Sequence, residues 1–550
     1  MKAKKWLATA VALTMAGSLV VGCSTTTGDP GKDGKKKEVV ISTNEPGEIP
    51  SIDPALAKDS QSSWVIDHVM EGLYFQDKDG LKPGQAKEHK VSADGITYTF
   101  TLKDGLKWSN GDAVTAHDFE FAWKRVLDPA TASEYAYIIA DYIKGGKEYN
   151  SADAKKEGEA GMKKLRDAVG VKALDDKTLE VQLAAPTPFF LQLVSYYTYY
   201  PVPKKVVESN AKWAAEANTY VSNGPFKVVE WAKDKRLVAA KNENYWSKDT
   251  ITADKIIWNN LSDDNTAWQM YQNGELNMFR AVPPAATEQA LKTGEMKPTP
   301  QLATYFYRFN VTKPPFNNVK VRKAFAMAID RKAIIDNVTK AGQKPAYAFV
   351  SPGIKAPDGK DFREAGGNAF FKEDANEAKK LLEEGLKELG MSSMPKITLT
   401  YNTNEGHKKI AEAIQEMWKK NLGVEVELQN AEWKVYLDKV HKLDYQVARA
   451  GWIGDYLDPI TFIDMFVTKG DNNETGWSNP KYDELVVASK KEQDQKKRDQ
   501  MLHDAEKILM DEMPIMPIYF YTHNNAYKPE LQGYYQPANR EPVFRYATIK

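Results

Sequence analysis

The stretch 449–455 combines residue types that could bind a charged ligand. Gly451 lets a backbone approach a ligand closely, and Trp452 offers an apolar wall. Asp455 would supply a fixed negative charge, and a buried carboxylate needs a cationic partner such as the ammonium group of a ligand. Gly-Asp is also common turn chemistry, so Asp455 can equally be read as a turn residue. Arg449 lies inside a predicted strand, where we expect a charge to face a cleft or a partner.

Two further side chains stand at the starts of predicted helices. His407 opens the helix after a strand ending at Tyr401, and Trp433 opens the helix after a strand ending near Leu428. In open α/β sheets, ligands bind beyond the carboxyl ends of the strands. We therefore expect these side chains at the same edge as 449–455. Position alone also allows that His407 has no role in binding and that Trp433 belongs to the hydrophobic core.

The elements that would position these residues alternate between strand and helix. They are strands at 305–310, 396–401, 424–428 and 445–450 and helices at 319–338, 407–421 and 432–442. Gly423, just past the second helix, is typical of a helix C-terminus. Strands and helices that alternate through short connections imply a parallel sheet.

The N-terminal half is predicted to mix α and β structure. The pattern indicates strands at 38–42, 97–102 and 177–183, a turn entering a strand at 222–231, and helices at 63–74 and 117–127. Asp128-Pro129 ends the last of these helices.

The N-terminus has the pattern of an export signal with a lipid attachment site. Basic residues within 1–5 precede an apolar run up to Val21 that is too short to be read first as a spanning helix. Gly22 and Cys23, the single cysteine of the chain, resemble the bacterial lipobox, in which the cysteine is lipidated and becomes the first mature residue. An ordinary signal with a buried thiol is the alternative. The polar segment 23–37 is predicted to be a flexible tether.

The composition argues against several classes of function. Lys+Arg and Asp+Glu both number 75, whereas nucleic-acid-binding chains usually carry a basic excess. The sequence has no GxSxG, HExxH, P-loop or GxGxxG motif, and its seven histidines form no pair at metal-ligand spacing. We expect no enzyme, no metal and no cofactor, with a hydrolase built from distant Asp and Glu residues as the open alternative.

Six stretches, in order along the chain, resemble the peptide-binding proteins of ABC importers, most closely the oligopeptide-binding members. They are IDP at 52–54, VSADGITYTFTL and its continuation at 91–129, SNGPF at 222–226, FNVTKPPFNN and its continuation at 309–331, NTNEGHKK and its continuation at 402–433, and RAGWIGDYLDP at 449–459. Each stretch alone is weak evidence for the resemblance, but all six in this order are highly specific for it.

The resemblance implies an α/β fold of the periplasmic-binding-protein kind, type II, in its large three-domain variant. A mixed α+β lobe and an α/β lobe, joined by two crossing strands, would close on an extended peptide. The implied domains are a signal peptide at 1–22, the tether at 23–37, lobe 1 at 38–302 with an inserted subdomain at about 62–200, lobe 2 at 303–519 and a return to lobe 1 at 520–550.

The resemblance also assigns ligand-binding roles. Asp455 would hold the peptide N-terminus, and Gly451 and Ile453 would offer backbone groups to the peptide. Trp433 and Trp452 match aromatic pocket walls.

The remaining assigned residues would meet other parts of the ligand. Arg449 and His407 match residues that meet the carboxylate ends of peptides of different length, and Tyr135 is a weaker match. Three consecutive residues would pair with the peptide from the other lobe: Ile49, Pro50 and Ser51. A second basic residue that the resemblance predicts falls at Val440, between Lys439 and His441, so carboxylate recognition departs here from the family pattern.

The implied partners are short peptides of about two to six residues, bound like an added strand, and ABC permease subunits. The chain would be a monomer that binds no nucleic acid and is attached by a lipid on Cys23 to the outer face of a cytoplasmic membrane, as in Gram-positive cells. Dipeptide, pheromone-peptide and nickel-chelate capture are the alternatives within the binding class.

Overall fold

The computed structural model describes residues 38–355 and 359–550. The predicted signal peptide, the tether and Cys23 lie outside these residues. Across the described part of the chain, every helix is too short or too polar to cross a membrane.

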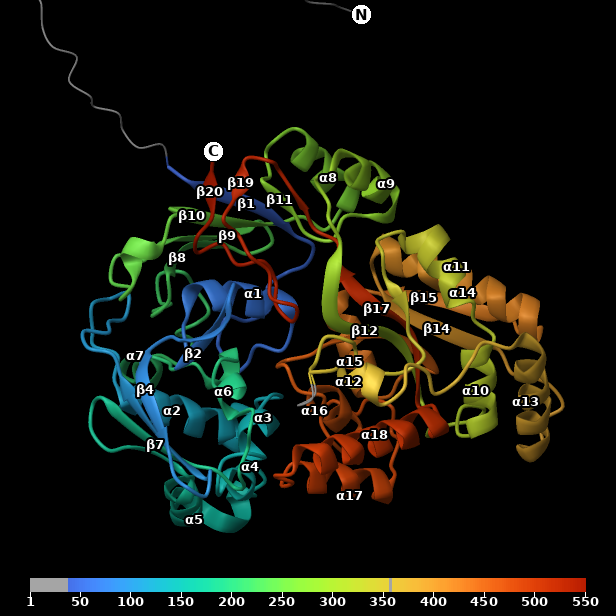
Figure 1. Ribbon diagram of the computed structural model, residues 1–550, viewed down its shortest axis with the longest axis horizontal. Helices are drawn as coiled ribbons and strands as arrows, with labels where there is room; N and C mark the ends of the chain where they lie inside the picture. Colours follow the sequence, from blue (N-terminus) through green and yellow to red (C-terminus); the bar gives the residue numbers. More distant parts are fainter. Residues whose placement is uncertain (1–37, 356–358) are drawn as a thin grey trace, which may run out of the picture. The chain divides into compact units, whose positions relative to one another are not determined.

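Lobe 1 contains a six-stranded and a four-stranded sheet (Figure 1), and β2–β3 and β19–β20 form two further two-stranded sheets. The larger has the order β18 (Ala526–Tyr527), β11 (Met278–Phe279), β1 (Val40–Glu45), β10 (Lys255–Asn260), β9 (Arg236–Lys241) and β8 (Phe226–Ala232). Its core is aromatic: Trp258 on β10 meets Trp64 of helix α1 (Ser60–Val69) edge to face, with ring centroids 6.0 Å apart. Since β18 comes from the C-terminal end of the chain, lobe 1 is completed only by the last residues.

The second sheet of lobe 1 is antiparallel throughout. Its order is β4 (Ala86–Val91), β5 (Thr97–Leu102), β7 (Thr178–Gln182) and β6 (Val171–Ala173). β5 alternates as predicted, with Tyr98, Phe100 and Leu102 buried. Helix α2 (Ala116–Leu127), which begins with a Thr115/Asp118 capping box, packs against β6 and β7.

The remaining elements of lobe 1 are short or lie on its surface. They are β2 (Tyr74–Asp77), β3 (Gly80–Pro83), α3 (Tyr137–Ala140), α4 (Gly146–Asn150), α5 (Ala154–Ala168), α6 (Phe190–Leu193), α7 (Lys204–Ser209), α8 (Asp264–Gln272), α9 (Pro284–Thr293), β19 (Leu531–Gln532) and β20 (Thr548–Ile549).

Lobe 2 is built on one mixed sheet. Its order is β13 (Lys344–Pro345), β17 (Ile515–His523), β12 (Thr299–Phe309), β16 (Val447–Ile453), β14 (Ile397–Asn402) and β15 (Val426–Ala431). β14 is parallel to both β15 and β16, which confirms the predicted parallel unit. β12 is antiparallel to β16 and to β17, so the sheet as a whole is not parallel.

Helices cover this sheet and extend lobe 2. They are α10 (Val319–Met327), α11 (Arg331–Ile334), α12 (Phe362–Ala365), α13 (Ala375–Glu388), α14 (Glu405–Leu422), α15 (Trp433–His441), α16 (Ile460–Ile463), α17 (Pro480–Ser489) and α18 (Gln495–Glu512). α14 buries the stripe Ile410, Ile414 and Trp418 and ends at Gly423 with φ of 68°, as the sequence predicts.

Two long strands, β12 and β17, connect the sheets of the two lobes and pair with each other (Figure 1). The predicted lobe boundaries at 302/303 and 519/520 both fall inside these strands. The division of the chain at those residues therefore remains a prediction.

Two predicted helices have different bounds in the structure. The helix predicted at 63–74 ends at Val69, because Met70 is extended and the Asn223 side chain bonds the backbone of Glu71. The helix predicted at 319–338 is broken into α10, α11 and a π-helical turn at Ile335–Thr339.

The buried Arg331 accounts for the second difference. Its guanidinium donates to the carbonyls of Ala326 and Ile329, so these backbone carbonyls keep a hydrogen-bond partner where the helix is broken. Asp330 caps the new helix by accepting from the Ala333 N–H.

Candidate ligand-binding site

A cavity of about 830 Å³ is lined by residues of both lobes, a size within the usual range for ligand pockets. Eight predicted site residues line it: Tyr135, His407, Trp433, Arg449, Gly451, Trp452, Ile453 and Asp455. The last five come from β16 and the turn after it. The strand continues through Ile453, three residues beyond its predicted end at Ala450.

The predicted segment Ile49, Pro50 and Ser51 does not line this cavity. Ile49 is buried, and the Ser51 hydroxyl accepts a hydrogen bond from the backbone of Asp53. A turn closed by bonds from Leu56 and Ala57 to the Asp53 carbonyl then carries the chain to the cavity. This part of lobe 1 therefore lines the cavity on either side of the predicted segment, with Pro46 and Gly47 before it and Lys58, Asp59, Ser60 and Gln61 after it.

Asp455 is a buried carboxylate at the cavity wall, with 8% of the residue exposed. Its backbone N–H donates to Thr461 Oγ1 (2.9 Å), and its carbonyl accepts from Asn539 Nδ2 (3.0 Å). No Lys, Arg or His of the described chain lies within 4 Å of its carboxylate. Burial raises the pKa of Asp455 to about 7, although a hydrogen bond from the Tyr196 hydroxyl favours the ionised form.

Tyrosines surround this carboxylate. Tyr135, Tyr196 and Tyr197 pack together, with ring centroids 4.4–6.0 Å apart, and all three line the cavity. Burial raises the pKa of each hydroxyl well above its usual value, and the charge of Asp455 adds to this effect. The tyrosines are therefore neutral donors that leave the negative charge of Asp455 in place.

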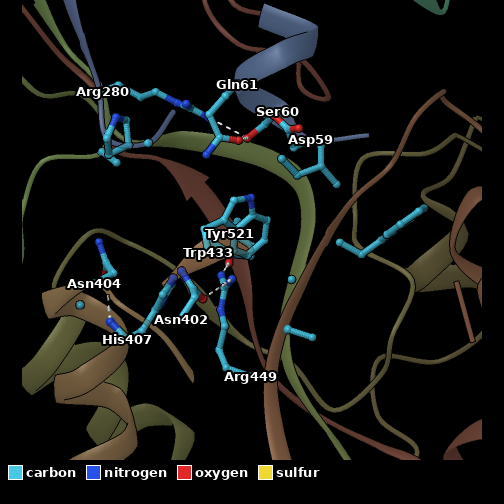
Figure 2. Close-up of a pocket in the computed structure, with 18 of the residues that line it drawn as sticks. Asp59, Ser60, Gln61, Arg280, Asn402, Asn404, His407, Trp433, Arg449 and Tyr521 are labelled. Atoms are coloured by element: carbon cyan, nitrogen blue, oxygen red, sulfur yellow. Dashed lines mark hydrogen bonds between the residues drawn. The ribbon is translucent and has the colours of Figure 1, made fainter. Parts of the chain in front are cut away.

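Arg449 is the one guanidinium at the cavity that lacks a carboxylate partner among the described residues. It donates to Tyr521 Oη (2.6 Å) and Asn402 Oδ1 (3.4 Å), as Figure 2 shows, and lies 4.7 Å from the ring centroid of Tyr305. Each of the other cavity-lining arginines pairs with an acid: Arg280 with Glu45 and Glu541, Arg308 with Glu474, and Arg540 with Asp67.

His407 lies beside Arg449 as a neutral imidazole. Burial, and then the positive charge of Arg449, hold the pKa of His407 well below its usual value. Its Nδ1 is 3.3 Å from Tyr305 Oη, and its backbone N–H donates to Asn404 Oδ1, the cap of α14 (Figure 2). It can offer a neutral hydrogen bond to a carboxylate, not a second full charge.

The two predicted tryptophans are held differently. Trp433, the first residue of α15, stacks on Tyr436 with centroids 6.1 Å apart, and its indole N–H is buried without a partner in the described chain. Trp452 donates to the carbonyl of Thr461 (2.7 Å). Because the Thr461 hydroxyl also accepts from the Asp455 backbone, this one residue holds the Trp452 side chain and the backbone of Asp455.

Gly451 is required by the packing around Arg449. A Cβ at this position would lie 2.8 Å from Tyr521 Oη and 3.2 Å from Arg449 Nη2. The glycine therefore leaves room for the hydrogen bond between those two groups.

The edge of β16 near the cavity is open. On one side Gly451, Trp452 and Ile453 pair with β12, whereas on the other side β14 pairs only with Val447 and Ala448. Beyond Ala448 the second edge of the strand has no strand partner among the described residues, and Gly451 is exposed. Such an edge can accept another extended chain.

Sequence reasoning missed the lobe 1 contribution from distant segments. Tyr196 and Tyr197, and Asn539 to Glu541 at the C-terminal end, line the cavity. No motif marks these residues, which come from segments far apart in the sequence. At the departure from the family pattern, Val440 is buried and Lys439 pairs with Asp444 (3.2 Å), whereas His441 lines the cavity.

Comparisons with known proteins show what this chain is similar to. The model of the bacterial extracellular solute-binding proteins, family 5 (middle), matches residues 80–474. The chain is 44% identical to the dipeptide-binding protein DppE of Bacillus subtilis, over 97% of this chain and 96% of that one. It is equally 44% identical to the oligopeptide-binding protein OppA of the same organism, over 94% of each.

A solved structure extends the likeness to the fold. Listeria monocytogenes OppA bound to peptide superimposes with a TM-score of 0.84 at 32% identity, covering 94% of this chain and 99% of that one. The predicted two-lobe fold class is thus confirmed, and this chain belongs to the family 5 bacterial extracellular solute-binding proteins.

Proposed function

We propose that this chain is an extracytoplasmic receptor that binds short peptides and delivers them to an ABC importer. One observation carries the proposal: a buried carboxylate and a guanidinium, neither of which forms an ion pair with any residue that the structure describes, line the same cavity. Free peptides carry an ammonium at one end and a carboxylate at the other. Asp455 would bind the first and Arg449 the second.

The spacing of these charges favours a short ligand. Asp455 follows Arg449 by six residues of mostly extended chain, which span about 20 Å at most. An extended peptide advances by the same distance per residue. A peptide of a few residues therefore fits between them.

The open edge of β16 would bind the peptide backbone as an added strand. Backbone pairing is independent of side-chain identity, so it gives affinity without sequence preference. A roomy cavity with ordered water accommodates different side chains at little cost. We therefore propose broad sequence tolerance, in keeping with relatives named for dipeptide and oligopeptide binding.

Attachment to the membrane through a lipid on Cys23, delivery to permease subunits and action as a monomer belong to the same proposal. Replacing Cys23 by Ala should release the protein from the membrane fraction. Retention of the Cys23→Ala variant there would count against the anchor.

Native mass spectrometry of the purified protein tests the function. A ladder of co-purified masses, each removed by mild denaturation and matching a short peptide, is the expected result. Co-purification of dipeptides alone would indicate that the ligands are dipeptides. Co-purification of one hydrophobic peptide would indicate that the ligand is a signalling peptide. A single metal complex, or turnover of an added peptide mixture, would contradict the proposal.

A further inference from the structure

A group of side chains outside the cavity joins the two lobes. Lobe 1 contributes residues beside α3 and α6, and lobe 2 contributes residues from the turn after β16 and from α17 and α18 (Figure 1). We call this group the interlobe clasp: Asp141, Tyr142 and Phe189 of lobe 1, and Tyr456, Lys490 and Arg498 of lobe 2. None of the six lines the cavity.

The clasp has an ionic half. Lys490, at the end of α17, donates a 2.5 Å hydrogen bond to Asp141 of lobe 1. Its ammonium also lies 3.6 Å from the Asp464 carboxylate and 5.5 Å from the Tyr142 ring centroid. The Lys490 side chain is only 15% exposed. Loss of the lysine would leave two carboxylates close together with little water to screen them.

The clasp also has an aromatic half. The Tyr456 ring stacks on Phe189 with centroids 5.4 Å apart and planes 5° apart, and its hydroxyl lies 3.4 Å from that of Tyr142. Arg498 lies 5.0 Å from the Phe189 ring centroid. All of these contacts cross from one lobe to the other, so they can exist only while the lobes are together.

The clasp is continuous with the peptide site through one turn. Tyr456 directly follows Asp455 in the chain, and Asp458 accepts two hydrogen bonds from Arg498 (2.7 and 2.8 Å). The turn that presents the ligand-binding carboxylate is therefore the same turn that contacts lobe 1. Opening the lobes must break the clasp and withdraw Asp455 from its tyrosines together.

We propose that the interlobe clasp holds the lobes closed around the peptide and sets how long any peptide is retained, whatever its side chains. The inference rests on the proposed function and concerns the regulation of that same site. A contact that exists only in the closed state stabilises that state by the same amount for every ligand. Weakening it lowers the closed fraction, and apparent affinity falls in proportion for all peptides.

The test compares Lys490→Met with a matched control, Lys481→Met, on the same helix. Lys481 is exposed and pairs with Glu484 of its own helix. Stopped-flow displacement is measured with several peptides that differ in length and side chains. The Lys490→Met variant should release each peptide faster by about tenfold or more, by the same factor for all of them, while the control matches wild type.

Unchanged release by a folded Lys490→Met protein would overturn the proposal, and so would a factor that differs widely between peptides. Asp141→Asn provides a second variant from the opposite lobe. The double variant should release peptide little faster than either single variant, because both substitutions remove the same contact.

A measurement without peptide separates failure of the clasp from failure of the proposed function. Dyes on Val91→Cys and Val435→Cys, both at exposed positions in different lobes, report closure in a Cys23→Ala background. Single-molecule energy transfer should show about tenfold fewer closed molecules in Lys490→Met than in wild type. Equal closed populations would refute the clasp. If the wild-type protein bound no peptide but the closed population was still smaller in Lys490→Met than in wild type, the result would support the clasp and contradict the proposed peptide binding.

Discussion

Arg449 donates a 2.6 Å hydrogen bond to the hydroxyl of Tyr521. Tyr521 belongs to β17, one of the two strands that connect the lobes, so the guanidinium is fixed at the base of the cavity. A hydroxyl orients the guanidinium without neutralising it. The site therefore keeps a positive charge directed at the ligand, which a salt bridge within the protein would have removed.

Replacing Arg449 by Met should weaken binding of peptides with a free C-terminus by about 10- to 100-fold, because a charge-assisted bond in a dry site contributes about 1.5–3 kcal/mol. Amidation of the peptide C-terminus should have a similar effect on wild type and little further effect on the variant. Calorimetry with the free and amidated forms of one tripeptide measures both. Additive losses would mean that Arg449 does not meet the carboxylate.

Replacing Asp455 by Asn should weaken capture by a similar factor, since a neutral amide would replace the charge that faces the ammonium. N-acetylation of the peptide should reproduce the loss in wild type. The variant should no longer distinguish free from acetylated peptide in calorimetry. Equal binding of the two peptides by wild type would remove the role of Asp455.

Peptide affinity should fall as the pH drops below 7. In the ligand-free protein burial raises the pKa of Asp455 to about 7 from its usual 3.8, and only the ionised form pairs with an ammonium. At pH 6 binding should therefore release close to one proton, and affinity should fall by up to about tenfold per pH unit. Calorimetry in two buffers of different ionisation enthalpy counts the protons. Asp455→Asn should abolish the release.

The same shift has a consequence for stability. Between its ordinary pKa and about 7, Asp455 holds a proton in the folded protein but not in the unfolded chain. The contribution of this group to the free energy of unfolding therefore decreases as pH rises through that interval and is constant above it. Asp455→Asn should remove this pH dependence, which thermal unfolding of wild type and variant at several pH values would detect.

Gly451→Ala should reduce affinity without unfolding the protein. The added methyl would meet Tyr521 Oη at 2.8 Å and Arg449 Nη2 at 3.2 Å, and overpacking of this size costs about 1–3 kcal/mol. Because Gly451 is exposed, the side chains that must move are those of Tyr521 and Arg449 in the site. Calorimetry should show a loss of about tenfold with an unchanged far-ultraviolet spectrum; wild-type affinity would contradict the packing argument.

Local periodicity was sufficient for the elements that carry most of the site. β14, α14 and α15 lie within a few residues of their predicted bounds, because each has a clear apolar pattern and a recognisable end. The break after α10 was missed, since its apolar period continues through it. It depends on Arg331, whose buried hydrogen bonds to distant carbonyls leave no sequence pattern.

Most of the predicted residues that line the cavity lie in lobe 2, and Tyr135 is the one from lobe 1. Trp433 opens α15, and Arg449 and Asp455 follow on β16 and the turn after it, so their order along the chain brings them together. Residues 49–51 do not line the cavity, which this part of the chain reaches at Gly47 before them and at Lys58 after them, so their role toward the ligand remains a prediction. The neutral state of His407 follows from burial beside Arg449, which spacing alone does not reveal.

A crystal structure of the protein with a bound tripeptide would show whether Asp455 and Arg449 bind the two ends of the ligand. We expect the peptide ammonium within hydrogen-bond distance of the Asp455 carboxylate, the peptide backbone paired along Gly451 to Ile453, and the terminal carboxylate at Arg449. A peptide bound in the reverse direction, or one whose ammonium lies away from Asp455, would contradict it.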